Sequence, residues 1–173
     1  MKIAIVDDLA DERALLKVRL EKALAQRSVQ AEFLEYESGE AFLRAANAER
    51  FAAAFLDIYM PGINGVETAK ALRTMDSECL LIFTTTSTDH ALEGFQVRAM
   101  HYLVKPFTEE DVYQLTDEIL ARIPQPDKYM NIKVAGGDVQ LSYRNIVYAE
   151  HFSHIIHIHT TAWKTLITRM PFK

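Results

Sequence analysis

Three carboxylates and one lysine stand directly after apolar runs in this 173-residue sequence, at the points where buried strands would end. Asp7 and Asp8 follow a β-branched run, Asp57 closes the run that begins at Phe51, and Lys105 follows a shorter apolar run. A carboxylate buried among apolar neighbours is costly unless a cation or hydrogen bonds meet it. Three carboxylates in one place would also repel one another, and Mg²⁺, which prefers one or two carboxylates, a carbonyl and waters, would relieve that repulsion. With the ammonium of Lys105 beside them, the set has the groups that phosphoryl transfer to a carboxylate nucleophile requires.

The segments that would position these side chains alternate five times between a strand pattern and a helix pattern. Strands are expected at residues 2–6, 31–36, 52–56, 80–83 and 102–104, and helices at 11–25, 39–46, 65–74, 89–95 and 108–123. The first helix is expected to bury Ala14, Leu15, Val18, Leu20 and Leu24. This alternation predicts an α/β fold with a doubly wound (βα)5 parallel sheet of the flavodoxin type, in which ligands bind at the carboxyl ends of the strands. We therefore expect one domain over residues 1–123, with the charged side chains gathered at one edge of its sheet.

The helical pattern disappears after residue 123. The Pro-rich residues 124–128 indicate a short linker, and residues 129–173 predict a small, incomplete all-β module with a hairpin turn at Gly136 and Gly137. Its strands are expected at residues 129–135, 139–142, 145–150, 155–160 and 163–168. Residues 1–122 carry a net charge of −8 and residues 123–173 a net charge of +3. This asymmetry favours two modules, the second of them suited to an anionic partner.

Other features of the sequence point to the cytoplasm. No apolar run approaches the roughly 18 residues of a membrane span, so we expect no membrane partner. The first residues enter a strand directly and have no signal-peptide pattern. The single cysteine, Cys79, cannot form an internal disulfide and is expected to be a small core residue.

Several separated motifs together resemble the receiver domain of bacterial two-component response regulators. They are Ile5-Val6-Asp7-Asp8, the run from Leu56-Asp57 through Pro61-Gly62 to Asn64-Gly65, Phe83-Thr84-Thr85, and Tyr102-Leu103-Val104-Lys105-Pro106-Phe107. Their order and spacing match that family over about residues 1–122. The resemblance implies a receiver fold and a signalling protein rather than an enzyme, one that assists its own phosphorylation and dephosphorylation.

The resemblance also implies a role for each residue of the acidic set. Asp57 would be the phosphoacceptor for a sensor histidine kinase. Asp8 would bind Mg²⁺ directly, Asp7 chiefly through water, and Asp57 and the backbone carbonyl of Tyr59 would complete the protein's share of the metal ligands. Lys105 would pair with Asp57 and then with the phosphate.

Further residues are implied to read the phosphate. Thr85 and Tyr102 would form the switch pair, and the peptide bond before Pro106 would be cis. Thr84 and Thr86 stand on either side of Thr85. In the family the residue after the switch threonine is usually small, so Thr86 is a departure that bears on access to the phosphate.

Residues 145–160 resemble the start of the LytTR-type DNA-binding domain, an all-β module that follows a receiver in one class of response regulators. By position, Ser153 and His154 are the candidate DNA contacts. The resemblance covers about 45 residues of a domain usually near 100, so we expect DNA binding by these 173 residues alone to be weak or absent. His157 and His159 alternate with isoleucines, which favours the outer face of a strand over a metal site.

The sequence leaves more than one function open. The leading hypothesis is a response regulator in which phosphorylation of Asp57 controls homodimerisation, through the face formed by helix 4, strand 5 and helix 5, and promoter binding by the complete protein. The alternative is a receiver-based protein-interaction module that does not bind DNA. An aspartyl phosphatase is a more distant reading, because that pattern requires a second acid two residues after the nucleophile and position 59 is tyrosine.

Overall fold

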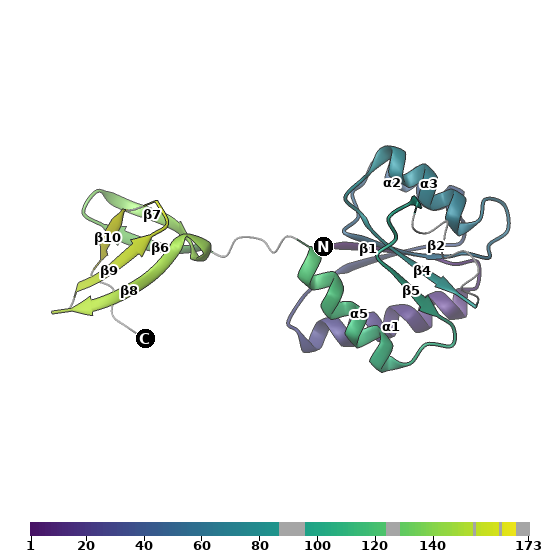
Figure 1. Cartoon of the computed structure of the whole chain (residues 1–173), viewed down its shortest axis with the longest axis horizontal. Helices are drawn as coiled ribbons and strands as arrows, with labels where there is room; N and C mark the ends of the chain where they lie inside the picture. Colours follow the sequence, from purple (N-terminus) through teal and green to yellow (C-terminus); the bar gives the residue numbers. More distant parts are fainter. Residues whose placement is uncertain (87–95, 124–128, 154, 163, 169–173) are drawn as a thin grey trace. The chain divides into compact units, whose positions relative to one another are not determined.

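The computed structural model describes residues 1–86, 96–123, 129–153, 155–162 and 164–168. The chain divides into two compact units, Met1–Ile123 and Pro124–Lys173. In Figure 1 the first unit has helices on both sides of a sheet, whereas the second unit is built from strands.

A five-stranded parallel sheet forms the centre of the first unit. Its strands are β1 (Lys2–Val6), β2 (Glu32–Tyr36), β3 (Ala53–Asp57), β4 (Leu80–Thr85) and β5 (His101–Val104). Their order across the sheet is β2-β1-β3-β4-β5, and every neighbouring pair runs parallel. The order reverses at β1, which places a ligand crevice at the carboxyl ends of β1 and β3. The predicted doubly wound sheet is confirmed.

Within the described residues, three helices connect consecutive strands of this sheet and a fourth follows β5. They are α1 (Ala10–Gln26), α2 (Gly39–Ala46), α3 (Gly65–Met75) and α5 (Glu109–Arg122). Side chains cap three of them, since Ser38 accepts a hydrogen bond at the start of α2 and Asn64 and Thr108 form capping boxes with Glu67 and Asp111. These caps satisfy backbone N–H groups that have no partner inside the helix. The helix expected at residues 89–95 lies outside the described residues.

The sheet of the first unit is covered on both faces (Figure 1). Residues of α2 and α3 pack on one face against Ala4, Val6, Ala54 and Leu56, and residues of α1 and α5 pack on the other against Ile3, Ile5, Ala53 and Phe55. Burial on both faces explains why the inner strands β1, β3 and β4 are almost continuously apolar rather than alternating.

The buried side of α1 differs from the prediction. The residues that α1 buries are Leu16, Leu20, Ala23 and Leu24. The prediction was right for Leu20 and Leu24 and wrong for Ala14, Leu15 and Val18, which are exposed. The buried set follows the i, i+4, i+7, i+8 pattern of a single helical stripe, and the three exposed residues lie off it.

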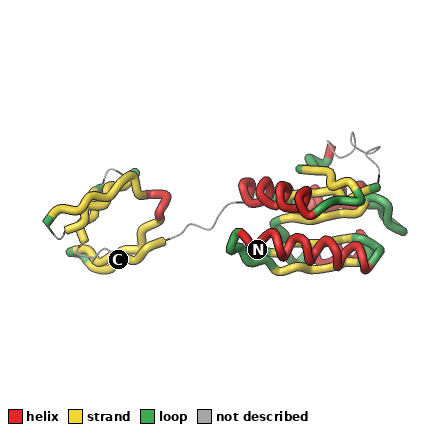
Figure 2. The backbone as a smooth tube through the Cα atoms, turned by 90° about the horizontal axis from the view of Figure 1, so that it is seen from below, coloured by secondary structure: helices red, strands yellow, loops and turns green. Residues whose placement is uncertain are grey.

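The second unit contains a hairpin and a three-stranded antiparallel sheet. The hairpin pairs β6 (Tyr129–Val134) with β7 (Gly137–Ser142), and the sheet contains β8 (Ile146–Phe152), β9 (Ile155–Thr160) and β10 (Thr165–Thr168) in the order β10-β9-β8. A short helical turn, Tyr143–Asn145, separates β7 from β8 (Figure 2). The unit buries a small core formed by Ile132, Leu141, Ile156 and Ile158. Its all-β character agrees with the prediction.

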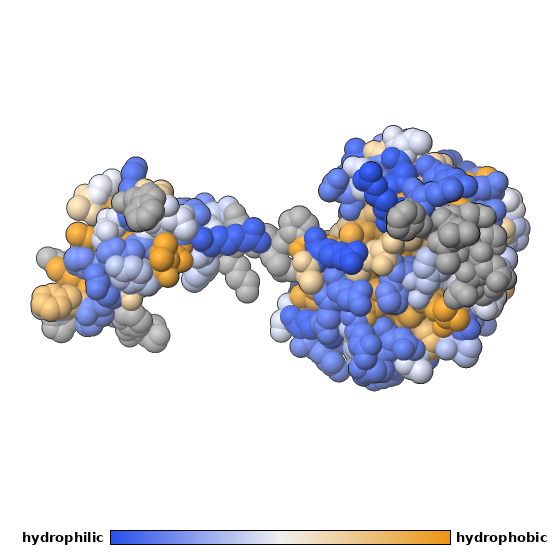
Figure 3. All heavy atoms as spheres, viewed as in Figure 1, coloured by the Kyte–Doolittle hydropathy of each residue, from blue (hydrophilic) through white to orange (hydrophobic). Residues whose placement is uncertain are grey.

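No helix within the described residues is long and apolar enough to cross a membrane. The face of the molecule drawn in Figure 3 is largely hydrophilic, with smaller apolar areas between the polar side chains.

Candidate functional site

Asp57 is the last residue of β3 and lies almost entirely out of contact with solvent. Every residue of β3 is buried, and only 5% of the surface of Asp57 is exposed. The strand ladder pairs Asp57 with Thr84 of β4, and the N–H of Ile58 donates to the carbonyl oxygen of Thr84 over 3.2 Å. The backbone on both sides of the carboxylate is therefore fixed by the sheet.

Two further carboxylates stand at the end of the neighbouring strand β1. Asp7 is buried, whereas Asp8 is exposed. One carboxylate oxygen of Asp7, Oδ1, accepts a hydrogen bond of 2.9 Å from the N–H of Leu9. The guanidinium of Arg13 donates to the backbone carbonyl oxygen of Asp7 over 2.6 Å. Both the backbone and the side chain of Asp7 are thereby held in place.

The sequence reasoning did not single out Arg13. The available signal was an arginine in the first turn of α1, the helix that begins just after Asp7. Its contact with Asp7 depends on how the start of α1 packs against the end of β1.

Lys105 follows β5 and joins the carboxylates of two strands. Its Nζ atom lies 2.7 Å from Oδ2 of Asp7 and 3.1 Å from Oδ1 of Asp57, and its side chain is only 13% exposed. Glu12 on α1 lies farther away, with 3.9 Å between Oε2 and Nζ. The backbone N–H of Lys105 donates to the carbonyl oxygen of Thr85 over 2.7 Å, and the peptide bond to Pro106 is cis.

Burial and neighbouring charges shift the pKa values of two groups of this site, Asp57 and Lys105. Burial raises the pKa of the Asp57 carboxyl, the Lys105 ammonium opposes that effect, and the charges of Asp7 and Asp8 add to it. Burial acts to lower the pKa of Lys105, but its hydrogen bond to Asp7 and the charges of Asp57 and Asp7 outweigh burial and raise it. The lysine therefore remains a cation, and one ammonium faces three carboxylates.

The acidic cluster fits a hard divalent cation. Ligand atoms of Asp7, Asp8 and Asp57 all lie within 4.8 Å of one another. Carboxylate oxygens are the donors that Mg²⁺ takes, usually one or two of them together with waters and a carbonyl. Because one lysine cannot neutralise three carboxylates, the remaining negative charge favours a cation at this point.

A tightly closed loop, residues 58–64, leaves Asp57 and carries Tyr59. The N–H of Gly65 donates to the carbonyl oxygen of Ile58 over 3.0 Å, which closes the loop at its base. A Cβ atom at Gly65 would lie 2.1 Å from the carbonyl oxygen of Asp57, so this approach requires glycine. The loop thus keeps the backbone of Tyr59 two residues from Asp57, next to the acidic cluster. The side chain of Tyr59 is largely exposed.

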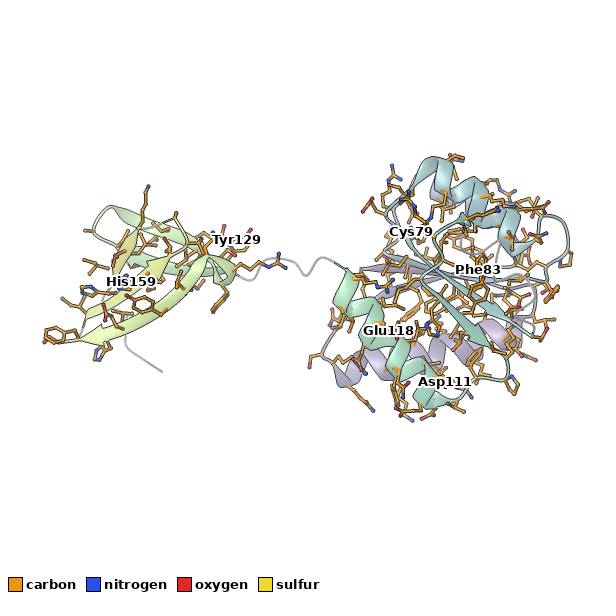
Figure 4. The ribbon with its side chains drawn as sticks, viewed as in Figure 1. Cys79, Phe83, Asp111, Glu118, Tyr129 and His159 are labelled. Atoms are coloured by element: carbon orange, nitrogen blue, oxygen red, sulfur yellow. The ribbon has the colours of Figure 1, made fainter. Side chains whose placement is uncertain are left out.

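Thr85 and Tyr102 lie on neighbouring strands and on the same face of the sheet. Phe83 pairs in register with Tyr102, and their ring centroids are 5.3 Å apart; Figure 4 labels Phe83. Since side chains alternate along a strand, Thr85 shares the face of Phe83 and Tyr102, whereas Thr84 faces the other way. Thr84 and Thr85 are both buried, and Thr86 is exposed beyond the end of β4.

Of the two candidate DNA contacts, Ser153 lies in the second unit, directly after β8. Ser153 is exposed there with a φ of 48°, and His154 lies outside the described residues. The ring of His159, labelled in Figure 4, stacks on Tyr148 at 4.2 Å, and its Nε2 lies 3.0 Å from Oε1 of Glu150. His157 and His159 alternate with the buried Ile156 and Ile158, as the sequence predicted. Among the described residues, the cluster suited to a metal is the aspartate cluster of the first unit.

Comparison with known proteins adds an independent observation. The family model of the response regulator receiver domain matches residues 3–117. The sensory transduction protein LytT of Oceanobacillus iheyensis is 36% identical over 112 residues, which are 64% of this chain and 45% of that protein. LytT of Bacillus anthracis is 31% identical over 140 residues, covering 80% of this chain and 54% of that protein. The chain therefore spans about half the length of the curated relatives it matches.

A solved structure shows the same similarity in three dimensions. The response regulator TrrA of Thermotoga maritima, crystallised in complex with Mg²⁺ and BeF, is 28% identical and superposes with a TM-score of 0.59. The match covers 68% of this chain and 97% of that one.

Proposed function

The chain belongs to the response regulator receiver family, and from this premise we propose that Asp57 accepts a phosphoryl group from the phosphohistidine of a sensor kinase. Members of this family are signalling proteins whose receiver domains interact with sensor kinases and bind Mg²⁺ at an acidic pocket. The observation that carries the proposal is the convergence of Asp7, Asp8 and Asp57 within 4.8 Å, with Lys105 bridging two of them.

Each residue of the cluster has a distinct part in this chemistry. A carboxylate oxygen of Asp57 is the nucleophile, and the backbone of β3 holds it at the carboxyl edge of the sheet. The Lys105 ammonium, 3.1 Å from Asp57, is placed to neutralise charge on the transferred phosphoryl oxygens. Asp7, Asp8, Asp57 and the carbonyl of Tyr59 would hold Mg²⁺, which when bound neutralises further charge on the same oxygens.

Positioning and charge neutralisation of this kind are most of what phosphoryl transfer needs from a protein. The receiver thereby assists its own phosphorylation and, with water as the acceptor, its own dephosphorylation.

The kinase would approach across α1 and the segment after β5. Leu15 and Val18 on α1 and Leu9 just before it expose 43%, 61% and 56% of their surface, and Leu15 and Val18 lie one helical turn apart, where together they offer a partner an apolar contact. A groove beside them reaches the active lysine and is lined by Glu12, Leu15, Arg19, Thr86, Lys105, Pro106 and Phe107. A kinase domain seated here would bring its phosphohistidine to Asp57.

For the output we propose that engagement of the phosphate by Thr85, together with inward rotation of Tyr102, favours a homodimer. The dimer would form through the face that contains β5 and α5. In the complete protein this dimer would bind promoter DNA through a LytTR-type domain, with contacts at Ser153 and His154. Curated proteins similar to this chain include a transcriptional regulatory protein, RprY of Bacteroides fragilis, which supports that output.

The alternative output is a receiver that acts through protein contacts alone. A salt-dependent gel shift with residues 1–173 and with a form carrying a complete LytTR domain separates the two, because counterion release makes phosphate contacts strongly salt-dependent. Binding by the longer form supports transcriptional control. Absence of binding by both forms, phosphorylated or not, supports the alternative.

The phosphoacceptor proposal is tested by incubating the protein with acetyl phosphate and Mg²⁺ and recording its intact mass. One phosphoryl group should add to the wild type, and EDTA should prevent the addition. Asp57→Asn should remain unmodified, since it keeps the shape of the side chain and lacks the nucleophilic carboxylate. A phosphorylated Asp57→Asn variant would contradict the assignment.

A further inference from the structure

The loop that carries Tyr59 is held from outside by a carboxylate on α2. The N–H of Ile63 donates to Oε1 of Glu40 over 3.1 Å. Glu40 stands in the first turn of α2, and 23 residues separate it from Ile63 in the sequence. This contact therefore ties the second half of the loop to α2, a helix that supplies none of the three aspartates of the acidic cluster.

The contact is closely fitted at Gly62. This residue has a φ of +79°, in the left-handed region that favours glycine, and a Cβ atom built on it would lie 2.6 Å from Oε1 of Glu40. The carboxylate thus lies directly over the backbone of the loop at the point where the chain turns. Its own backbone N–H and that of Ile63 lower the pKa of Glu40, so the acceptor is ionised at neutral pH.

The start of α2 leaves no room for the loop to move towards it. A Cβ atom at Gly39 would lie 2.0 Å from Oγ1 of Thr68 and 2.8 Å from the side chain of Ile63. The base of the loop is closed separately, by the bond from Gly65 to Ile58. The loop is thus held at its base and at Ile63, on both sides of the segment that contains Tyr59.

We propose that Glu40 is a positioning residue for the metal site, holding the loop so that the Tyr59 carbonyl is presented to Mg²⁺ before the ion binds. This inference rests on the proposed function, which assigns Mg²⁺ to the acidic cluster. Glu40 does not touch the ion; it acts through the backbone from Ile63 back to Tyr59. Outer groups that orient metal ligands contribute substantially to affinity, because the ligands then need no reordering when the ion arrives.

Substitutions of Glu40 separate the effect of its side-chain length from the effect of its charge. Glu40→Asp keeps the negative charge and the acidic first turn of α2, but it is one methylene shorter and cannot reach Ile63. Glu40→Gln removes the charge but keeps an oxygen acceptor at the same reach. Glu40→Ala removes both, and Glu37→Gln, at an exposed site just before α2, is the control for loss of one acidic charge.

The test combines Mg²⁺ titration by calorimetry with amide hydrogen exchange of Ile63 in the metal-free protein. Glu40→Asp and Glu40→Ala should bind Mg²⁺ about tenfold more weakly than the wild type. Both should also lose protection at Ile63, whereas Glu40→Gln and Glu37→Gln should match the wild type in both measurements. Wild-type affinity and protection in Glu40→Asp would overturn the inference, as would weakened binding in Glu40→Gln equal to that in Glu40→Ala.

Mg²⁺ binding by the wild type distinguishes failure of this inference from failure of the proposed function. If the wild type binds no Mg²⁺, the proposed function fails, and the exchange of Ile63 still reports whether Glu40 holds the loop. If the wild type binds Mg²⁺ and all four variants bind it equally, the metal site stands and the positioning role is wrong. Thermal unfolding of each variant checks that α2 remains folded.

Discussion

Lys105 donates its shorter hydrogen bond to Asp7 and its longer one to Asp57, with Nζ–Oδ distances of 2.7 Å and 3.1 Å. In the metal-free site the lysine is therefore shared between the residue proposed to bind the metal and the residue proposed to accept the phosphoryl group. Neutralisation of Asp7 by a divalent cation would weaken its hold on the lysine. The ammonium would then be more available to pair with the negatively charged oxygens of a phosphoryl group on Asp57.

The raised pKa of Asp57 predicts that its charge destabilises the metal-free fold at neutral pH. Burial is the main cause of that shift. An acid with a raised pKa in the folded state favours folding most below its unfolded pKa and loses that contribution as the pH rises through the folded pKa. Asp57→Asn should therefore be more stable than the wild type at pH 7.5 in EDTA, with a higher urea midpoint.

Urea unfolding with and without Mg²⁺ measures this effect. Mg²⁺ should stabilise the wild type more than Asp57→Asn, because an ion that binds only the folded state stabilises it by RT ln(1 + c/Kd), where c is the free ion concentration, an amount that grows with its affinity. A metal-free Asp57→Asn variant that unfolds at lower urea than the wild type would show that the burial argument is wrong.

Thr85, rather than its buried neighbour Thr84, is expected to couple the phosphate to dimerisation. Thr85 shares the face of Phe83 and Tyr102, whereas Thr84 faces the other side of the sheet. Thr85→Ala should accept a phosphoryl group as the wild type does but should remain monomeric afterwards, as judged by analytical ultracentrifugation. Thr84→Ala is the matched control and should still dimerise; the reverse pattern would assign the switch to Thr84.

Asp76 is expected to stabilise the turn between α3 and β4 in a pH-dependent way. Its Oδ1 accepts from the N–H groups of Glu78 and Cys79 over 2.8 Å and 3.1 Å. Burial acts to raise the pKa of Asp76, but these N–H groups and the Arg50 guanidinium outweigh it and hold the pKa below its usual range. Asp76→Ala leaves both N–H groups without this acceptor and should cost about 1–2 kcal/mol at pH 7.

The pH dependence of the stability lost in Asp76→Ala is the control for this prediction. A lowered folded pKa gives stability that is present above the unfolded pKa, about 3.9, and is lost as the pH falls through the folded value. The gap between the wild type and Asp76→Ala in urea unfolding should therefore narrow between pH 5 and pH 2. A gap that stays constant across this range would mean that the ionised carboxylate is not what stabilises the turn.

Cys79 is expected to be unreactive while the protein is folded. Its thiol is 2% exposed, and burial raises its pKa to about 12, so the thiolate that attacks disulfide reagents is scarce at pH 8. Reaction with Ellman's reagent should be slow in buffer and fast in denaturing urea. Comparable rates in the two conditions would show that the residue is accessible in the native state.

The sequence was sufficient for the fold because the first unit depends on long apolar runs punctuated by caps and turns. The strand end at Val6 and the helix starts after Ser38, Asn64 and Thr108 follow from such local signals, and β3 ends at Asp57, one residue beyond the predicted end. The buried stripe of α1 was less accessible, since Leu15 and Leu16 are both apolar and only packing decides which one faces the sheet.

The residues of the site also divide into those that the sequence predicts and those that only packing reveals. Asp7, Asp8, Asp57 and Lys105 could be grouped from the sequence because parallel strands bring their carboxyl ends to one edge. The contributions of Arg13 and Glu40 could not, because each depends on where a helix places a long side chain against a distant backbone. Helical periodicity predicts the face of a residue but not the atom it reaches.

The central claim, that Asp57 is the phosphoacceptor, is tested most directly by locating the phosphoryl group. After incubation with acetyl phosphate and Mg²⁺, borohydride reduces an aspartyl phosphate to homoserine, and peptide mapping identifies the converted position. We predict homoserine at position 57 alone, and none when EDTA replaces Mg²⁺. Homoserine at position 7 or 8, or a phosphorylated protein without conversion at position 57, would contradict the account.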